Sequence, residues 1–198
     1  MIIFKDLNSA EPYQKLKELY EKAHLSNQKN IEAISISSYS KVLNEVNSRF
    51  VNLKFINNKD FIFFSNYRSS KSKEFNDHNQ VTALIYWNSI NVQIRIKARI
   101  KKTSIEFNKD YFLNRSEKKN ALAISSNQSE SIDSFETVIK NYSNSLKSDD
   151  LKKCPDYWGG YSFTPYYFEF WEGHESRLNK RDKYEIQDDH WDHGTLQP

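Results

Sequence analysis

Arg177 and Arg181 stand four residues apart, just after the densest aromatic segment of the chain. Guanidinium groups bind phosphate and carboxylate oxygens through several charge-assisted hydrogen bonds at once. A rigid strand that leads into two such groups could therefore hold an anionic ligand. Arginines that follow a core strand can equally be solvated surface residues, and the pattern alone leaves both interpretations open.

The aromatic segment must position these arginines. Residues 166–171 read Y-Y-F-E-F-W, and this run of alternating aromatic side chains predicts a β-strand. Ahead of it stand Gly159 and Gly160, two of only four glycines in the chain. Adjacent glycines beside Trp158 indicate a backbone that needs either a positive φ or the close approach of another group.

Residues 64–71, F-S-N-Y-R-S-S-K, form a second candidate for anion binding. We expect Ser69 to cap a short helix that runs to Phe75. Such a helix would place Lys71 and free backbone N–H groups at its N-terminus, where anions bind favourably. The alternative is a solvated basic loop.

The composition limits the classes of protein. At 198 residues, with 15% aromatic residues, the chain can form one domain whose core is built largely from Phe and Tyr. A net charge of +3 does not indicate bulk nucleic-acid binding. The single Cys154 excludes an internal disulfide. There is no membrane-length apolar run and no secretory signal, so we expect a soluble cytoplasmic protein.

Residues 188–193, D-D-H-W-D-H, are the densest group of potential metal ligands. His190 and Asp192 could share one face of a strand, whereas His193 would point away from it. We interpret the segment as an exposed hairpin and predict no metal site.

The predicted fold class is mainly β with flanking helices (α+β). We expect strands at residues 33–37, 81–87 and 92–101, a hairpin that joins residues 50–55 to 61–64, and a final hairpin of residues 182–187 and 190–196. Helices are expected at residues 9–23 with Ser9 as cap, at 104–114, and at 131–146 with Ser131 as cap, followed by a polar loop to residue 153.

Three motifs in the last third of the chain, W-G-G-Y, E-F-W-x-G and R-L-x-x-R, resemble the C-terminal signature of the pyridoxamine 5'-phosphate oxidase family. R-F-V-N-L-K at residues 49–54, residues 64–71 and Y-F-L-N-R at residues 111–115 also resemble family motifs. The resemblance implies an FMN-binding split β-barrel and a homodimer with FMN at the subunit interface. It implies a single domain over residues 1–198, with a helical extension at residues 1–30 and a segment at 155–198 for dimerisation and for FMN and substrate binding.

The resemblance also implies site residues. Those for FMN are Arg49, Phe50, Val51, Asn52, Leu53, Lys54, Phe64, Ser65, Ser70, Lys71, Gln93, Gln128, Ser129, Trp171 and Arg181, of which Gln128 and Ser129 would reach the flavin of the partner subunit. Those for the substrate are Lys54, Tyr111, Arg115, Lys119, Arg177 and Asn179, with Arg177 and Lys54 as the catalytic pair.

The implied function is oxidation of pyridoxamine or pyridoxine 5'-phosphate to pyridoxal 5'-phosphate, with O2 as acceptor and H2O2 as product. The chain departs from the family pattern at several positions, among which Ser70 replaces an arginine, Lys119 a serine and Asn179 a histidine. Two alternatives therefore stay open. One is a related FMN oxidase with another substrate, such as those of phenazine biosynthesis, and the other is a non-catalytic protein that binds FMN or pyridoxal phosphate.

Overall fold

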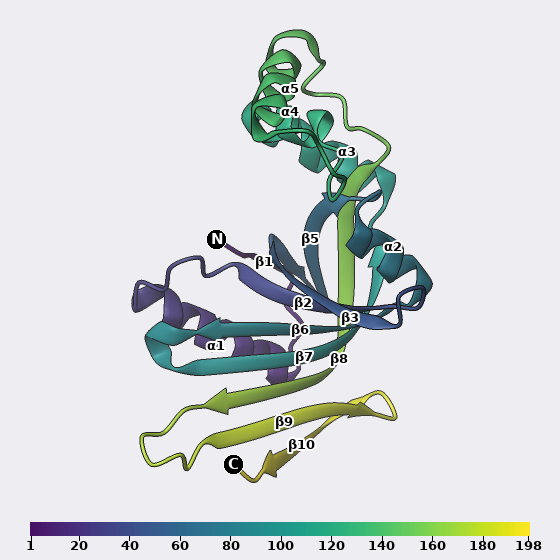
Figure 1. Ribbon diagram of the computed structural model, residues 1–198. Helices are drawn as coiled ribbons and strands as arrows, with labels where there is room; N and C mark the ends of the chain where they lie inside the picture. Colours follow the sequence, from purple (N-terminus) through teal and green to yellow (C-terminus); the bar gives the residue numbers. More distant parts are fainter.

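The computed structural model describes all 198 residues, and its sheet is organised around one long strand, β8 (Trp158–Glu172). The order of strands across the sheet is β1 (Ile3–Lys5), β4 (Phe55–Asn57), β5 (Asp60–Asn66), β8, β7 (Val92–Lys102), β6 (Gln80–Trp87), β2 (Ala33–Ser40) and β3 (Glu45–Asn52). The second half of β8 also pairs with β9 (Lys180–Gln187), which pairs with β10 (His190–Leu196). The sheet does not close on itself (Figure 1).

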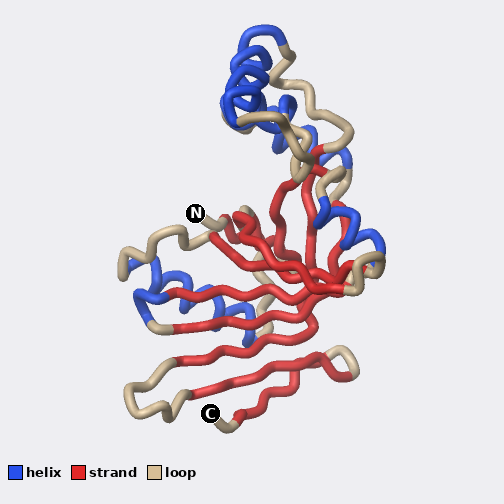
Figure 2. The backbone as a smooth tube through the Cα atoms, viewed as in Figure 1, coloured by secondary structure: helices blue, strands red, loops and turns tan.

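Helices flank this sheet in two places. Figure 2 shows α1 (Glu11–Leu25) against the β6–β7 part of the sheet, far from the other helices. Beyond the ends of β5 and β8 lie α3 (Ile105–Leu113), α4 (Glu117–Ser125) and α5 (Phe135–Ser148), with α2 (Ser70–Asp77) beside the same strands (Figure 1). A short 3-10 turn, η1 (Asn88–Ile90), joins β6 to β7. None of these helices is both long and apolar enough to cross a membrane. The predicted class, mainly β with flanking helices, is confirmed.

The core is aromatic, as the composition predicts. Phe61, Phe63 and Phe163 are fully buried and form one group of contacting rings. Tyr13 of α1 packs on Phe168 of β8, with 5.2 Å between ring centroids. The alternation in residues 92–101 is confirmed, because the apolar side chains of β7 point into this core.

Two predicted helix caps are wrong. Helix α1 begins at Glu11 after Ala10, and its N-terminus is approached by Asn8, whose side chain accepts a hydrogen bond from the Ala10 N–H at 2.9 Å. Helix α5 is capped by Ser134, not Ser131, through a 3.2 Å bond from Thr137 N–H, and it continues to Ser148 into the expected loop. Ser, Asn and Asp are frequent in both regions, so composition alone does not identify which one caps.

Other boundaries differ for reasons of tertiary pairing. The hairpin expected between residues 50–55 and 61–64 is divided, because β3 pairs with β2 while only β4 pairs with β5. Leu53, fully buried, lies at the break between the two strands. Ser69 does occupy the N-cap position of α2, but its hydroxyl donates to the Asn66 carbonyl at 2.7 Å instead of capping the helix.

The paired glycines are explained by close approach and not by a positive φ. A Cβ on Gly159 would lie 2.2 Å from the Tyr67 hydroxyl and 2.4 Å from Asn108 Nδ2. Asn108 is buried, and its Oδ1 accepts hydrogen bonds from the Gly160 N–H at 2.8 Å and the Thr103 hydroxyl at 2.6 Å. Any added atom therefore disturbs a satisfied buried network.

We expect Gly159→Ala to lower the free energy of unfolding by about 1–3 kcal/mol, the usual cost of overpacking. Urea unfolding followed by fluorescence measures this change. Gly194→Ala is the matched control, since its Cβ would meet only the flexible Lys183 side chain at 3.3 Å. Equal stability of the two variants would contradict the close-approach explanation.

Candidate active site

Ten residues from five separate parts of the chain line one cavity of about 230 Å³. Strand β3 and the residues after it supply one wall, β5 and α2 a second, and α3, with the segments after α3 and α4, a third. All ten belong to the set predicted for cofactor and substrate binding: Phe50, Val51, Asn52, Lys54, Phe64, Ser65, Lys71, Tyr111, Arg115 and Gln128.

Lys71 forms a buried positive charge at one side of this cavity. Lys71 belongs to α2 and is only 9% exposed. The ammonium donates to Gln128 Oε1 at 3.0 Å and to the Ser65 and Ser69 hydroxyls at 3.2 Å each. All three partners are neutral, so the charge has no paired carboxylate. Burial, together with the charge of Arg49, lowers the pKa of Lys71 to about 8, although Glu74 partly offsets this shift.

A pKa in this range gives a prediction for anion binding. Because a bound anion favours the protonated ammonium, affinity for a phosphorylated ligand, such as the FMN that the family resemblance implies, should fall as the pH rises above about 8. The FMN phosphate is already a dianion there, since its second pKa is about 6. Fluorescence titration of flavin-free protein between about pH 6.5 and 9.5 measures this effect. A flat profile across that range would contradict it.

A second group of cations lies across the cavity. Burial lowers the pKa of Lys54, and the charges of Lys119 and Arg115 lower it further, while Glu32 raises it. Arg115 donates to the Lys119 carbonyl at 2.9 Å and to Asn120 Oδ1 at 3.2 Å. Its guanidinium also lies 4.9 Å from the centre of the Trp158 ring, which fixes its plane.

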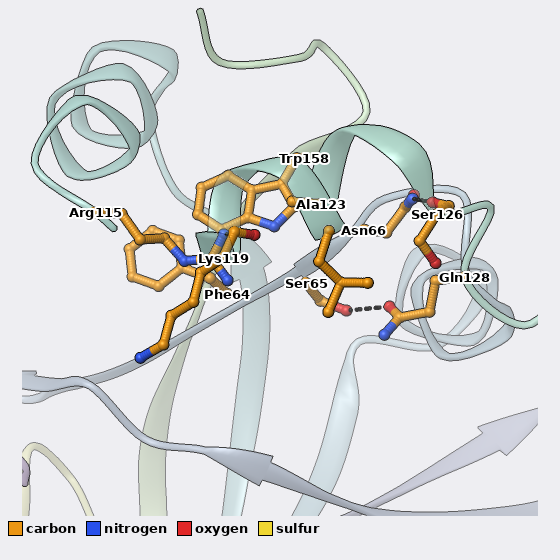
Figure 3. Close-up of a pocket in the computed structure, with 10 residues that line it drawn as sticks. Phe64, Ser65, Asn66, Arg115, Lys119, Ala123, Ser126, Gln128 and Trp158 are labelled. Carbon is orange, nitrogen blue, oxygen red and sulfur yellow. Dashed lines mark hydrogen bonds between the residues drawn. The ribbon is translucent and has the colours of Figure 1, made fainter. Parts of the chain in front are cut away.

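Three parallel aromatic rings form the floor between this cavity and a second one. Phe64 stacks on Tyr111 with 3.8 Å between centroids and on Trp158 with 5.1 Å. The second cavity, of about 210 Å³, shares four residues with the first and adds Asn66, Lys119, Leu122, Ala123, Ser126 and Trp158. Figure 3 shows Arg115, Lys119 and Phe64 on one side of it, and Ser126 and Gln128 on the other. Except for Lys119, these added residues lie outside the predicted site, although Asn66 and Trp158 belong to motifs quoted above.

Arg49, predicted to bind FMN, lines neither cavity, although its charge acts on Lys71. Its guanidinium forms an ion pair with the buried Glu74 at 3.0 Å and a hydrogen bond to Ser38 Oγ. Asn47 holds the other Glu74 oxygen at 3.0 Å. The missed feature is the carboxylate of Glu74, which the sequence places on a helix without showing that it is buried.

Smaller differences concern several of the predicted FMN and substrate residues. Ser70 is exposed at the start of α2, Leu53 is in the core, and Ser129 lines a different cavity beside α5. Gln128 lies in the cavity of its own chain, not only within reach of a partner. Tyr111 lies in α3 and Arg115 follows the end of that helix at Leu113, and both residues line the same cavity.

The remaining predicted residues lie at the other end of β8. Gln93 of β7 pairs with Trp171 of β8, which pairs with Arg181 of β9, so these three form one row across the sheet. Arg181 is held by two bonds to the buried Glu169, at 2.8 and 3.0 Å. Arg177 and Asn179 follow in the loop before β9.

None of these five predicted residues lines either cavity. Trp158, which lines the second cavity, and Trp171 are 13 residues apart on β8, or about 40 Å of backbone measured along the strand at ~3.3 Å per residue. The predicted site is therefore divided into two groups. The cavity group lines the first cavity, and the row group consists of Gln93, Trp171, Arg177, Asn179 and Arg181.

Comparison with known proteins identifies the family of this chain. Residues 158–198 match the family model described as the pyridoxine 5'-phosphate oxidase C-terminal dimerisation region. The chain is 32% identical to pyridoxine/pyridoxamine 5'-phosphate oxidase 1 of Hydrogenovibrio crunogenus, over 88% of this chain and 81% of that protein. It is 30% identical to the pyridoxine/pyridoxamine 5'-phosphate oxidase of Rippkaea orientalis, over 98% of this chain and 92% of that protein. The chain belongs to the pyridoxine/pyridoxamine 5'-phosphate oxidase family.

Solved structures agree with the oxidase family on the fold. PhzG of Burkholderia lata 383, in complex with tetrahydrophenazine-1-carboxylic acid, superposes with a TM-score of 0.87 at 24% identity, over 96% of this chain and 93% of that one. A pyridoxamine 5'-phosphate oxidase-related, FMN-binding protein of Nostoc punctiforme superposes with a TM-score of 0.79 at 11% identity, over 96% of this chain and 99% of that one. The predicted split β-barrel is thereby confirmed. The region matched to the oxidase dimerisation model contains most of the row group: Trp171, Arg177, Asn179 and Arg181.

Proposed function

We propose that this chain is an FMN-dependent oxidase that converts pyridoxamine or pyridoxine 5'-phosphate to pyridoxal 5'-phosphate, with O2 as electron acceptor and H2O2 as product. The observation that carries the proposal is the cavity lined by Lys54, Lys71 and Arg115, none of which is paired with a carboxylate. Partly buried cations without counter-ions favour a phosphorylated ligand. The relatives of about 30% identity that carry this oxidase name support the choice of substrate.

The two ends of the cavity suit two phosphate groups. Lys71, Ser65 and Gln128 would hold the FMN phosphate. The buried Lys71 ammonium supplies the charge, and its hydrogen-bond partners Ser65 and Gln128 are neutral. Lys54, Tyr111 and Arg115 would hold the substrate phosphate, because the cationic pair borders the Tyr111 ring. The donor set at the cavity therefore fits FMN and a phosphorylated substrate together.

When bound, FMN would supply the redox chemistry by accepting a hydride from the substrate carbon that bears the amine or alcohol and passing the electrons to O2. The protein residues bind and orient. Lys54 would fix the substrate beside the flavin, and the aromatic floor of Phe64 and Tyr111 would exclude water from that end of the cavity. Arg177 would complete the substrate contacts from the row group.

We also propose that the active unit is a homodimer built from single domains of residues 1–198. Most of the row group lies in the matched dimerisation region, and none of its residues lines the cavities of its own chain. A two-fold axis can bring the row group of one subunit to the cavity of the other. Residues 155–198 would then contribute both to dimerisation and to the partner's flavin site.

The absorption spectrum of the purified protein, before and after anaerobic addition of pyridoxamine 5'-phosphate, tests the function. We expect a flavin band that bleaches on addition and returns with air. A flavin band that persists would reject this substrate. Absence of flavin even after FMN is supplied would reject the cofactor.

A related FMN oxidase with another anionic ring substrate is the second candidate. It is motivated by Lys119 and Asn179, which replace the serine and histidine that the family resemblance implies. Asn179 Oδ1 accepts a hydrogen bond from the His174 N–H at 3.0 Å and cannot titrate near neutral pH. If the first candidate is right, Asn179→His should raise turnover of pyridoxamine 5'-phosphate, and unchanged turnover would favour the second.

A further inference from the structure

We propose that His174 is a positioning residue for Arg177: its neutral imidazole closes the turn that presents Arg177, and its protonation opens that turn. The inference rests on the proposed function, in which Arg177 contacts the substrate, and adds a dependence on pH to that same site. It concerns the loop of residues 173–179, which joins β8 to β9 (Figure 1).

The first step is the conformation of Arg177. Its N–H donates to the His174 carbonyl at 2.9 Å, which is the hydrogen bond of a β-turn over residues 174–177. Its φ is 59°, in the left-handed region that residues other than glycine rarely adopt. Residues 174–178 are all exposed, so burial does not impose this conformation. Hydrogen bonds within the loop must therefore hold Arg177 in place.

The second step is the contact that His174 makes in this turn. Its Nδ1 accepts a hydrogen bond from the Ser176 N–H at 3.1 Å, and its own N–H donates to Asn179 Oδ1 at 3.0 Å. Asp, Asn and Ser are favoured at the first position of a turn, because their side-chain oxygen accepts from the N–H two residues later. His174 makes the same contact through a ring nitrogen. A protonated imidazole has a donor at each nitrogen and no acceptor, so only neutral His174 can make it.

The third step is the charge around the imidazole. A histidine side chain can change its charge between about pH 5 and 8. None of the ion pairs of the chain includes His174; among histidines they involve His190 and His193. The ionisable side chains of its own loop, of the adjoining strand ends and of the turn at Asn91 are Glu172, Glu175, Arg177, Lys180 and Tyr86. Protonation therefore removes the bond from Ser176, and no existing ion pair replaces it.

The consequence concerns substrate affinity. Opening of the turn lowers the fraction of protein in which Arg177 is placed for the substrate, and the apparent affinity falls by that fraction. Since the turn is short and exposed, the loss of one hydrogen bond is a large part of what holds it. We therefore expect this turn to be closed at about pH 8 and largely open at about pH 5.5.

Two substitutions separate the acceptor from the charge. His174→Asn keeps a side-chain acceptor at the first position of the turn and cannot be protonated, whereas His174→Ala removes the acceptor at every pH. His24→Asn, at an exposed position of α1, is the matched control. The KM for pyridoxamine 5'-phosphate is measured at about pH 5.5 and about pH 8 and divided by the native value at the same pH, so that titration of the substrate cancels.

We expect His174→Ala to raise KM about three- to fivefold at pH 8, as for the loss of one hydrogen bond, and to match the native protein at about pH 5.5. His174→Asn should match the native protein at the higher pH and show the lower KM, by a similar factor, at the lower pH. His24→Asn should match it at both. Ratios that do not change with pH for the two His174 variants would overturn the inference.

Hydrogen exchange of the Ser176 N–H, followed by NMR, tests the turn without any substrate. In the native protein this N–H should be protected at about pH 8 and lose its protection at about pH 5.5, whereas His174→Asn should keep it at both. An unprotected Ser176 N–H in the native protein at the higher pH would refute the turn. If pyridoxamine 5'-phosphate is not oxidised, the proposed function fails while hydrogen exchange still decides the role of His174, so the two failures are distinguishable.

Discussion

Lys71→Met is expected to weaken FMN binding by about 100-fold, or ~3 kcal/mol, at pH 7. The substitution removes the one buried ammonium of the cavity, whose hydrogen-bond partners are neutral and cannot replace its charge. Loss of a charge-assisted contact to a phosphate costs about 1.5–3 kcal/mol, and the burial of Lys71 places the effect at the upper end. Titration of flavin-free protein with FMN, followed by quenching of flavin fluorescence, measures the dissociation constant.

The same substitution should raise the melting temperature of the flavin-free protein. A buried charge without a counter-ion opposes folding, so its replacement by an apolar side chain of similar length removes a cost. Lys73→Met, at an exposed position of the same helix, is the matched control and should change neither quantity. Unaltered FMN affinity in Lys71→Met would contradict the assignment of Lys71 to the phosphate, whatever happens to stability.

Two inactive variants are expected to restore activity when mixed. If the row group of one subunit completes the cavity of the other, Lys71→Met and Arg177→Ala each disable every site in their own homodimer. Random exchange of subunits at equal amounts makes half of the dimers mixed, and each mixed dimer has one intact site. About a quarter of native activity should therefore return, by this count of sites in a two-fold dimer.

The control mixes two variants with lesions in the same group. Lys71→Met and Lys54→Met both damage the cavity, so every mixed dimer carries one lesion in each site and activity should stay absent. Mild denaturation followed by joint refolding exchanges the subunits, and peroxide production reports the result. No recovery in the first mixture, with dimers demonstrated by light scattering, would refute a site shared between subunits.

Much of the fold could be predicted from local pattern. The alternation along β7 and the turn of Asp188 and Asp189, both with positive φ, follow directly from residue types. The pairing partner of β3 could not be predicted. Residues 45–57 form two strands that pair with different neighbours, and no local sequence signal marks the break between them. Helix α4 was also missed: only two of its nine residues are buried and its apolar pattern is weak.

The cavity lining was predictable because motif residues cluster there, whereas electrostatic partners were not. Arg49 was correctly placed on a strand, but its ion pair with Glu74 depends on the packing of α2 against β2 and β3. Similarly, Arg181 forms an ion pair with Glu169. The alternation of residues places Glu169 on one face of a strand, but it does not predict that Arg181 is its partner. Long-range ion pairs of this kind require the tertiary structure.

The docking of α1 has a consequence for the order in which the chain folds during synthesis. Tyr13 packs on Phe168 and Trp191, Lys15 pairs with Asp182 at 2.6 Å, and Glu11 accepts a hydrogen bond from Tyr184. Helix α1 is thus covered in part by strands that are synthesised well after it. Until those strands emerge, Tyr13 lacks two of its aromatic partners, so the nascent chain exposes part of the apolar face of α1 to aggregation and to chaperone binding.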